Sequence, residues 1–245
     1  MAKIYDLISN GELIPIEGEY NKKVKGEIET LSNILSTDDR QKGDRYKSLD
    51  FEGLLYHGTD VDNVKRINVS VYDNSMGLGV YLARDIKTAE DFAAERHSRG
   101  KLTGGKGYAG KPVVYEVETN RKLKLVDLTD DKRIKDVLVD FRMYLDRNRD
   151  KVRIDNGEKS RAYRAMWNKE VLDDHGKFVF SAFPEHFTKF LYKMGYDGII
   201  HGSENSRFSP FDEGVGTYTQ VVVFNPDDLK LVRSYDLRQK YNLKL

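Results

Sequence analysis

Short apolar blocks that suit β-strands are mixed at irregular spacing with segments of helical pattern, and this mixture limits the chain to few fold classes. Asp85 is the predicted N-cap of the helix that begins at Ile86, because its carboxylate can accept hydrogen bonds from the first helical amides. Irregular mixing predicts an α+β fold and not a doubly wound parallel sheet. The predicted strands are 54–56, 80–83, 113–117, 123–126, 199–200 and 220–224, and the predicted helices are 62–67, 86–96, 131–149, 159–172 and 184–194.

The first fifty residues differ in pattern from the rest and are predicted to be an N-terminal extension. Val24, Ile28, Leu31 and Ile34 follow helical spacing, and the polar stretch 37–50 is expected to be a linker. The main domain then covers residues 51–245, with a helical insertion at about 131–185 and exposed loops at 99–111 and 202–217. Two interpretations of the extension are open: a segment that packs on the domain, or a regulatory arm or partner-binding surface.

The composition excludes several classes of function. The 245 residues contain no cysteine, which excludes disulfides, thiolate zinc sites and cysteine nucleophiles. Lys and Arg number 41 against 40 Asp and Glu, a balance that argues against general coating of nucleic acid. No run approaches the roughly 18 apolar residues of a membrane span, and residues 1–10 lack the pattern of a secretory signal. We expect a cytoplasmic protein that makes no membrane contact.

Charge is unevenly distributed along the chain. Between Lys132 and Glu170 there are twelve basic and seven acidic residues, a local excess of +5. Acids and bases that interleave at helical spacing are typical of a solvated helix face with ion pairs. The same excess would suit a groove for a phosphate-bearing partner, so both interpretations stay open.

Several well-known motifs are incomplete. The run Gly100–Gly107 has the glycines and lysine of a phosphate-binding loop, but Gly107 stands where a Ser or Thr must hold magnesium. Residues 146–150 imitate the start of a calcium loop, yet Lys151 replaces the required glycine. The five histidines lack the spacing and acidic neighbours of a zinc site, so no metal is expected.

Three short blocks carry a stronger signal: YHGT at 56–59, GLGVYLA at 77–83 and YTQVVVFNP at 218–226. In this order they resemble the ADP-ribosyltransferases of the diphtheria-toxin and poly(ADP-ribose) polymerase class, whose sites combine His, Tyr and Glu from three strands. The run MGYDGII at 194–200, followed by a loop and a strand ending in Phe-Asn-Pro, is similar to bacterial and phage-borne members. The resemblance covers roughly residues 51–235. It implies an ADP-ribosyltransferase-like split β-sandwich with an NAD cleft, flanking helices and the helical insertion.

The resemblance also implies a role for individual residues toward NAD, which would be the substrate. His57 would hydrogen-bond the ribose on the adenosine side, and the backbone of Gly58 would pair with the nicotinamide carboxamide. Thr59 stands where related proteins often place a small hydroxyl residue that contacts NAD. Tyr81 would stack on the nicotinamide ring, and Phe92 would sandwich it from the other side. Phe92 has an alternative role in the buried stripe of its own helix.

Position 220 departs from the family pattern. Where the family has a catalytic Glu at the start of the last strand, this chain has Gln220. Together with His57 and Tyr81 it completes the expected catalytic set. A carboxamide can hydrogen-bond a ribose hydroxyl, but it supplies no negative charge. Losing one preorganised electrostatic group commonly costs about 10²–10³ in rate. Three accounts of Gln220 are therefore open: a natural member with slow or altered chemistry, a member in which Asp212 or Glu213 replaces the missing acid, and a deliberate Glu→Gln substitution.

The loop before Gln220 is where the family places target-recognition residues. Here it holds Arg207, Phe208, Phe211 and Tyr218, whose side chains are able to stack on a nucleobase or dock on a protein. The basic segment favours nucleic acid over protein as the target.

The sequence therefore predicts an NAD-dependent mono-ADP-ribosyltransferase that modifies a macromolecular target. We expect a bacterial or phage toxin, effector or defence protein, with an antitoxin or inhibitor as a further partner. The alternative is a catalytically silent module of the same fold that binds NAD or a partner. A third interpretation is an unrelated α+β binding protein in which His57 and Tyr81 are core residues, and it predicts no NAD binding.

Overall fold

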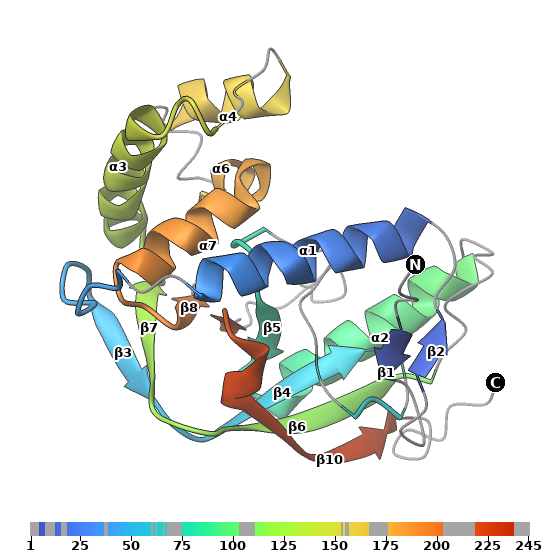
Figure 1. Ribbon diagram of the computed structural model, residues 1–245. Coiled ribbons are helices and arrows are strands. Elements are labelled where there is room, and N and C mark those ends of the chain that lie inside the picture. The colour runs from blue at the N-terminus through green and yellow to red at the C-terminus, as the bar shows by residue number, and fades with distance from the viewer. Residues whose placement is uncertain are drawn as a thin grey trace.

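The computed structural model describes residues 5–7, 13–15, 19–36, 39–59, 61, 63–65, 67, 75–102, 111–152, 154, 157–166, 176–202 and 219–237. Its architecture is α+β, as predicted, with helices packed around a strongly curved sheet (Figure 1). The first two strands, β1 (Tyr5–Leu7) and β2 (Leu13–Pro15), form a separate hairpin.

Within the described residues the main sheet has eight strands, in the order β10-β6-β4-β5-β9-β8-β7-β3. Neighbours are antiparallel except for β7 and β8, so the sheet is mixed. The apolar runs in β5 and β9 are buried at every position, as expected for strands covered on both faces. The strands are β3 (Ser48–Phe51), β4 (Leu54–Thr59), β5 (Val80–Ala83), β6 (Val113–Thr119), β7 (Leu123–Leu128), β8 (Gly198–His201), β9 (Gln220–Val223) and, after the short helix η1 (Pro226–Asp228), β10 (Leu229–Asp236).

The sheet is split between β4 and β5. These two strands share one register pair, Tyr56 with Ala83, whereas β4 is paired with β6 along its whole length. Both half-sheets send apolar side chains into one shared core, for example Leu55 from β4 and Leu125 from β7. This arrangement confirms the predicted split β-sandwich.

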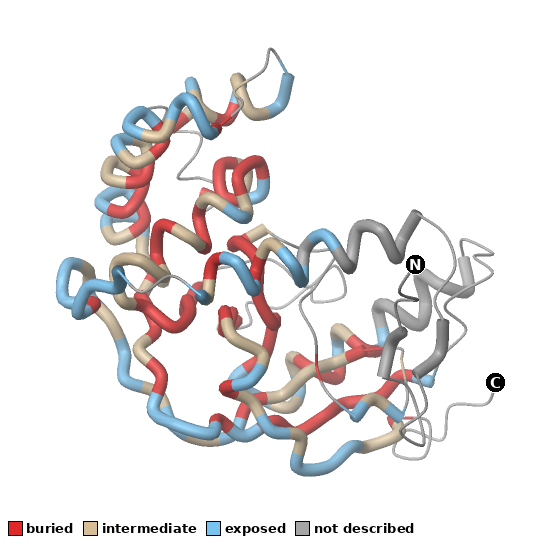
Figure 2. Tube along the Cα trace, viewed as in Figure 1, coloured by how far each residue is buried: buried red, intermediate tan, exposed pale blue. Residues whose placement is uncertain are grey.

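Helices form a second core on the outer side of β7, β8 and β9. They are α3 (Asp131–Arg147), α4 (Glu158–Ala165), α6 (Lys177–Ala182) and α7 (Pro184–Lys193). Phe187 of α7 stacks on Phe180 with ring centroids 3.9 Å apart and meets Phe141 of α3 edge-on at 5.1 Å. Figure 2 shows buried residues on the facing sides of these helices and exposed ones outside. Burying each such ring contributes roughly 1.5–3 kcal/mol.

Helix α2 (Ile86–Leu102) packs on β4. Its first turn is capped as predicted, because Asp85 Oδ1 accepts a hydrogen bond from the Thr88 amide at 2.8 Å. Ala89 and Ala93 are fully buried and belong to the same apolar cluster as Ala83. Their small side chains allow the helix to lie close to the strands.

The N-terminal extension packs on the domain through α1 (Glu19–Leu35). Leu31 and Ile34 contact Leu78 and the half-buried Tyr192 of α7. β3 begins at Ser48, inside the stretch expected to be a linker, and pairs with β7. The described part of the extension therefore adds a helix and a strand to the same body.

Ionic contacts around Asp197 join the extension to the sandwich. Its Oδ1 lies 3.0 Å from both Arg40 and Arg121, and its Oδ2 accepts from the Lys124 amide at 2.8 Å. Burial alone raises the pKa of Asp197, but the hydrogen bonds from Arg121, Lys124 and Arg40 lower it by more, and the net shift is downward. The carboxylate is thus held ionised in a nearly buried position.

Some predicted elements differ from the observed ones. Residues 61, 63–65 and 67 are not helical, which contradicts the predicted helix 62–67. Asn63 has φ of 58°, a left-handed conformation that interrupts a helix. Helix α2 continues through residues 99–102, which were expected to begin a loop. Helix α4 ends at Ala165, and residues 167–172 of the predicted helix 159–172 lie outside the described part.

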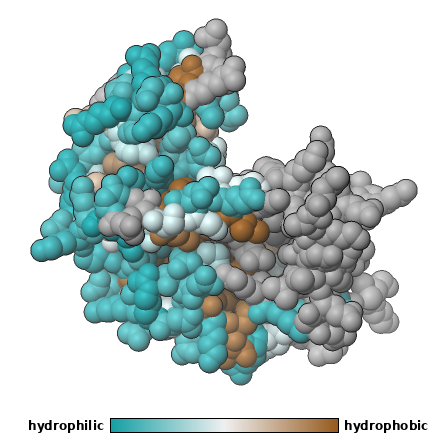
Figure 3. Space-filling view, viewed as in Figure 1, coloured by the Kyte–Doolittle hydropathy of each residue, from teal (hydrophilic) through white to brown (hydrophobic). Residues whose placement is uncertain are grey.

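The basic segment has many internal partners where it is described. Arg133 forms ion pairs with Asp127 and Asp130, and Arg142 lies over the ring of Tyr163 at 4.1 Å. The outer surface of α3 and α4 is largely hydrophilic in the view of Figure 3. These contacts favour the interpretation as a solvated, ion-paired helix face. Of the described helices, none combines the length and the hydrophobicity needed to span a membrane.

Candidate functional site

His57, Tyr81 and Gln220 lie on three neighbouring strands at the split in the sheet. Tyr81 is on β5, the middle strand of the three. On one side β5 meets β4, which carries His57, and on the other side it pairs with β9, which begins at Gln220. Because Gln220 is far from the other two in the sequence, only the pairing of the sheet brings the three blocks together.

The half-buried His57 ring bridges the two half-sheets. Its Nδ1 lies 2.9 Å from the backbone oxygen of Tyr81. A carbonyl oxygen only accepts, so Nδ1 donates and the neutral ring is the Nδ1–H tautomer. In the register His57 stands opposite Tyr115, on the face that fills the core between the half-sheets, whereas Tyr81 and Gln220 belong to the other face.

The hydroxyl of Tyr81 is fixed by the glycine-rich turn that precedes it. It donates to the backbone oxygen of Gly77 at 2.7 Å and accepts from the Met76 amide at 2.9 Å. The ring is 8% exposed and packs in the helical core. Gly77 has φ of 92°, which favours glycine and lets the chain turn sharply into β5.

Helix α7 holds the same turn from the other side. Thr188 Oγ1 accepts from the Leu78 amide at 2.7 Å and donates to the Leu78 oxygen at 3.0 Å. Thr188 is fully buried. The position of Tyr81 therefore depends on a helix that the motif itself does not contain.

The other expected contacts to NAD surround the start of α2. A Cβ added at Gly58 would lie 1.8 Å from the backbone oxygen of Ala89, so this glycine is required by the close approach of the helix. Thr59 is buried, and its Oγ1 accepts from the Val61 amide at 3.3 Å. Phe92 is half-buried on α2, one residue before the buried Ala93.

Gln220 is 7% exposed, and its Oε1 lies 2.8 Å from Nε2 of His201 on β8. Sequence reasoning did not single out His201 as a site residue. The available signal was its place directly after the strand residues Ile199 and Ile200, near the loop that leads to Gln220.

An acidic residue lies in the same row of the sheet as Gln220. Successive register pairs lead from Gln220 through Ala83 and Tyr56 to Glu116 on β6. The carboxylate of Glu116 is bonded by Arg233 at 2.7 and 2.9 Å and also accepts from Tyr235. The bonds from Arg233, then Tyr235, lower the pKa of Glu116. Glu116 is thus committed to β10 and does not replace the missing acid.

Several predicted site residues lie outside the described part of the chain. These are the target-recognition residues Arg207, Phe208, Phe211 and Tyr218, and the substitute acids Asp212 and Glu213. In the described ranges no three His, Asp or Glu residues form a group that could hold a metal ion.

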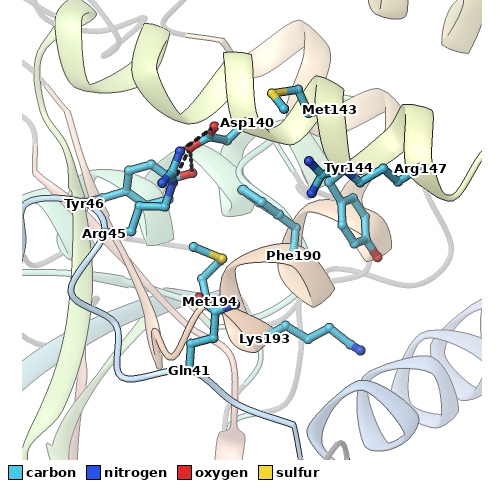
Figure 4. A pocket seen from close by; sticks show the side chains of 10 residues that line it. All are labelled: Gln41, Arg45, Tyr46, Asp140, Met143, Tyr144, Arg147, Phe190, Lys193 and Met194. Carbon is cyan, nitrogen blue, oxygen red and sulfur yellow. Dashed lines mark hydrogen bonds and ion pairs between the residues drawn. The ribbon is translucent and has the colours of Figure 1, made fainter.

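A separate pocket of about 410 Å³ lies between α3, α7 and residues 41–46 (Figure 4). Arg45 and Asp140 form a two-point ion pair on its wall, at 2.6 and 2.9 Å. Arg147 and Lys193 end their helices, where the helix dipole stabilises a cation, so their placement needs no anionic ligand. None of the three motif residues lines this pocket.

No protein-family model matches the chain, and no curated protein matches it. Among solved structures, a chain from the crystal structure of the M. tuberculosis MbcT–MbcA toxin–antitoxin complex is similar. The similarity covers 89% of this chain and 97% of that one, with 14% sequence identity and a TM-score of 0.39. A TM-score of this size does not establish a common fold.

Proposed function

We propose that the chain is an NAD-dependent mono-ADP-ribosyltransferase of the diphtheria-toxin and poly(ADP-ribose) polymerase class. The observation that carries this proposal is the placement of His57, Tyr81 and Gln220 on three neighbouring strands at the split of a β-sandwich. Each block alone is a weak signal. The sheet brings the three blocks onto neighbouring strands at the split, with Tyr81 and Gln220 on one face and His57 on the other.

In the proposed reaction the glycosidic bond between nicotinamide and ribose breaks. The bonding electrons leave with nicotinamide, the ribose gains oxocarbenium character, and a nucleophile of the target forms the new bond. His57 would hold the adenosine-side ribose, and the ring of Tyr81 would position nicotinamide together with Phe92. Because the hydroxyl of Tyr81 is held by Gly77 and Met76, its ring cannot swing freely, and a fixed ring suits the positioning role.

The neutral side chain at position 220 decides how fast this reaction runs. Without a carboxylate the developing positive charge lacks one preorganised partner, a loss of about 10²–10³ in rate. A second candidate function follows from the same residue: a silent module that binds NAD without releasing nicotinamide. The burial of Gln220 and the hydrogen bond between its oxygen and His201 favour this candidate, because they stabilise an uncharged side chain at this position.

For the biological role we propose a toxin, effector or defence protein that acts on a macromolecule, with nucleic acid favoured over protein. This choice rests on the sequence excess of +5 between Lys132 and Glu170 alone, since the described part of that segment gives Arg133 and Arg142 internal partners. Binding to a nucleic-acid target should weaken steeply as salt is raised, whereas a flat response would favour a protein target.

Nicotinamide release from NAD tests the proposal. The native chain, Gln220→Glu and His57→Ala are compared, with NAD binding to each measured by calorimetry. We expect the native chain to bind NAD, Gln220→Glu to release nicotinamide about 10²–10³ times faster, and His57→Ala to bind weakly. NAD binding with no release by either the native or the Glu form would favour the silent module. Absence of NAD binding would refute both candidates.

A further inference from the structure

The hydrogen bond between His201 and Gln220 joins the ends of β8 and β9. The two residues are register partners, and the bond runs from Nε2 of His201 to Oε1 of Gln220 at 2.8 Å. Their exposed fractions are 2% and 7%. Buried polar side chains are stable when they are hydrogen-bonded, so each residue supplies a partner for the other.

This bond determines which way the Gln220 carboxamide faces. A carboxamide oxygen only accepts, so Nε2 of His201 carries a proton and donates it. The oxygen of Gln220 is turned toward β8. Its NH₂ group, on the other arm of the planar amide, is therefore turned away from His201. On the opposite side of β9 lies β5, where Ala83 is the partner of Gln220 and Tyr81 projects from the same face.

We propose that His201 is a positioning residue of the NAD site: it holds the Gln220 carboxamide by its oxygen, so that position 220 meets a ribose hydroxyl as a hydrogen-bond donor. The inference rests on the function proposed above and adds a residue to it. A glutamate would meet the same hydroxyl as a charged acceptor. A donor holds the hydroxyl through its oxygen lone pairs and gives no stabilisation to an oxocarbenium ion. His201 thus explains how a neutral residue serves NAD binding at this position.

The test uses two substitutions at one position. His201→Phe removes the donor and keeps a planar ring, whereas His201→Gln restores an amide donor. His186→Phe is the matched control, since His186 is a half-buried histidine on α7 away from the three motif strands. The first readout is the side-chain amide signal of Gln220 in ¹⁵N NMR spectra recorded without NAD. The second is the affinity for NAD measured by calorimetry.

We expect His201→Phe to shift the Gln220 amide signals and to weaken NAD binding at least about tenfold. His201→Gln should recover most of that affinity, and His186→Phe should change neither readout. A purely structural role predicts no such rescue.

The outcomes separate this inference from the function on which it rests. If the native chain binds NAD and His201→Phe binds it equally well, the positioning role is wrong and the proposed function stands. If the native chain binds no NAD, both are wrong, whatever the amide signals show. Should His201→Phe fail to fold, the native spectrum decides, because a His201 ring protonated at Nδ1 alone overturns the inference.

Discussion

Substituting Gly58 by Ala places a methyl group where helix α2 already lies. The new Cβ would be 1.8 Å from the oxygen and 2.8 Å from the carbon of the Ala89 carbonyl, and 3.0 Å from the Ala93 amide nitrogen. An ordinary contact begins near 3.4 Å, so the helix backbone must retreat by more than 1 Å. Overpacking of this kind costs about 1–3 kcal/mol, and because all three contacts are with the backbone of α2, Gly58→Ala is expected to cost near 3 kcal/mol.

Urea unfolding followed by circular dichroism measures this loss. In thermal unfolding, the same loss of about 3 kcal/mol should lower the melting temperature of a chain of this size by about 6–12 °C. The matched control is Gly26→Ala on the exposed side of α1, where no atom lies within 4 Å of the added Cβ. That substitution should stabilise the protein by roughly 0.5–1 kcal/mol, because alanine is the better helix former. A Gly58→Ala protein as stable as the native one would refute the close packing of α2 on β4.

Three further predictions concern the surroundings of the site and use urea unfolding as the assay. Thr188→Val should lower the free energy of unfolding by about 2–3 kcal/mol, because it leaves the buried amide and carbonyl of Leu78 unpaired, and Thr188→Ser should restore most of it. Tyr81→Phe removes the hydroxyl that donates to the backbone oxygen of Gly77 and should lower the free energy of unfolding by about 1–3 kcal/mol. An unchanged free energy of unfolding would contradict the fixed position of the ring. The pKa of Asp197 is lowered in the folded protein. Its contribution to the free energy of unfolding is therefore complete above the ordinary carboxyl pKa of about 3.9 and is lost as the pH falls through the lower pKa of the folded state. Asp197→Asn should therefore lose less stability than the native protein between pH 5 and pH 2, and parallel pH curves would contradict this.

Local sequence patterns predicted the elements that have strong local signals. The strand 80–83 was predicted with its observed bounds, and Asp85 caps α2 as expected. The split between half-sheets followed from the resemblance of three blocks rather than from periodicity. It is confirmed by the single register pair between Tyr56 and Ala83.

The errors and omissions arise where distant contacts override local preference. The predicted helix 62–67 is interrupted at Asn63, and the next amide, that of Val64, donates to the hydroxyl of Tyr115 at 3.0 Å. The partnership of His201 with Gln220 depends on the register of β8 and β9, although the two residues lie nineteen positions apart in the sequence. No pattern within either strand specifies that register, so only the folded sheet reveals it.

The most direct test of the central claim is hydrogen–deuterium exchange of the native chain with and without saturating NAD. The account predicts slower exchange at residues 54–59, 75–83 and 219–223, the strands and turn that carry the three motif blocks. It predicts no change at residues 41–46 and in α3, which line the separate pocket. Protection confined to that pocket, or absent from the chain altogether, would contradict the assignment of the site.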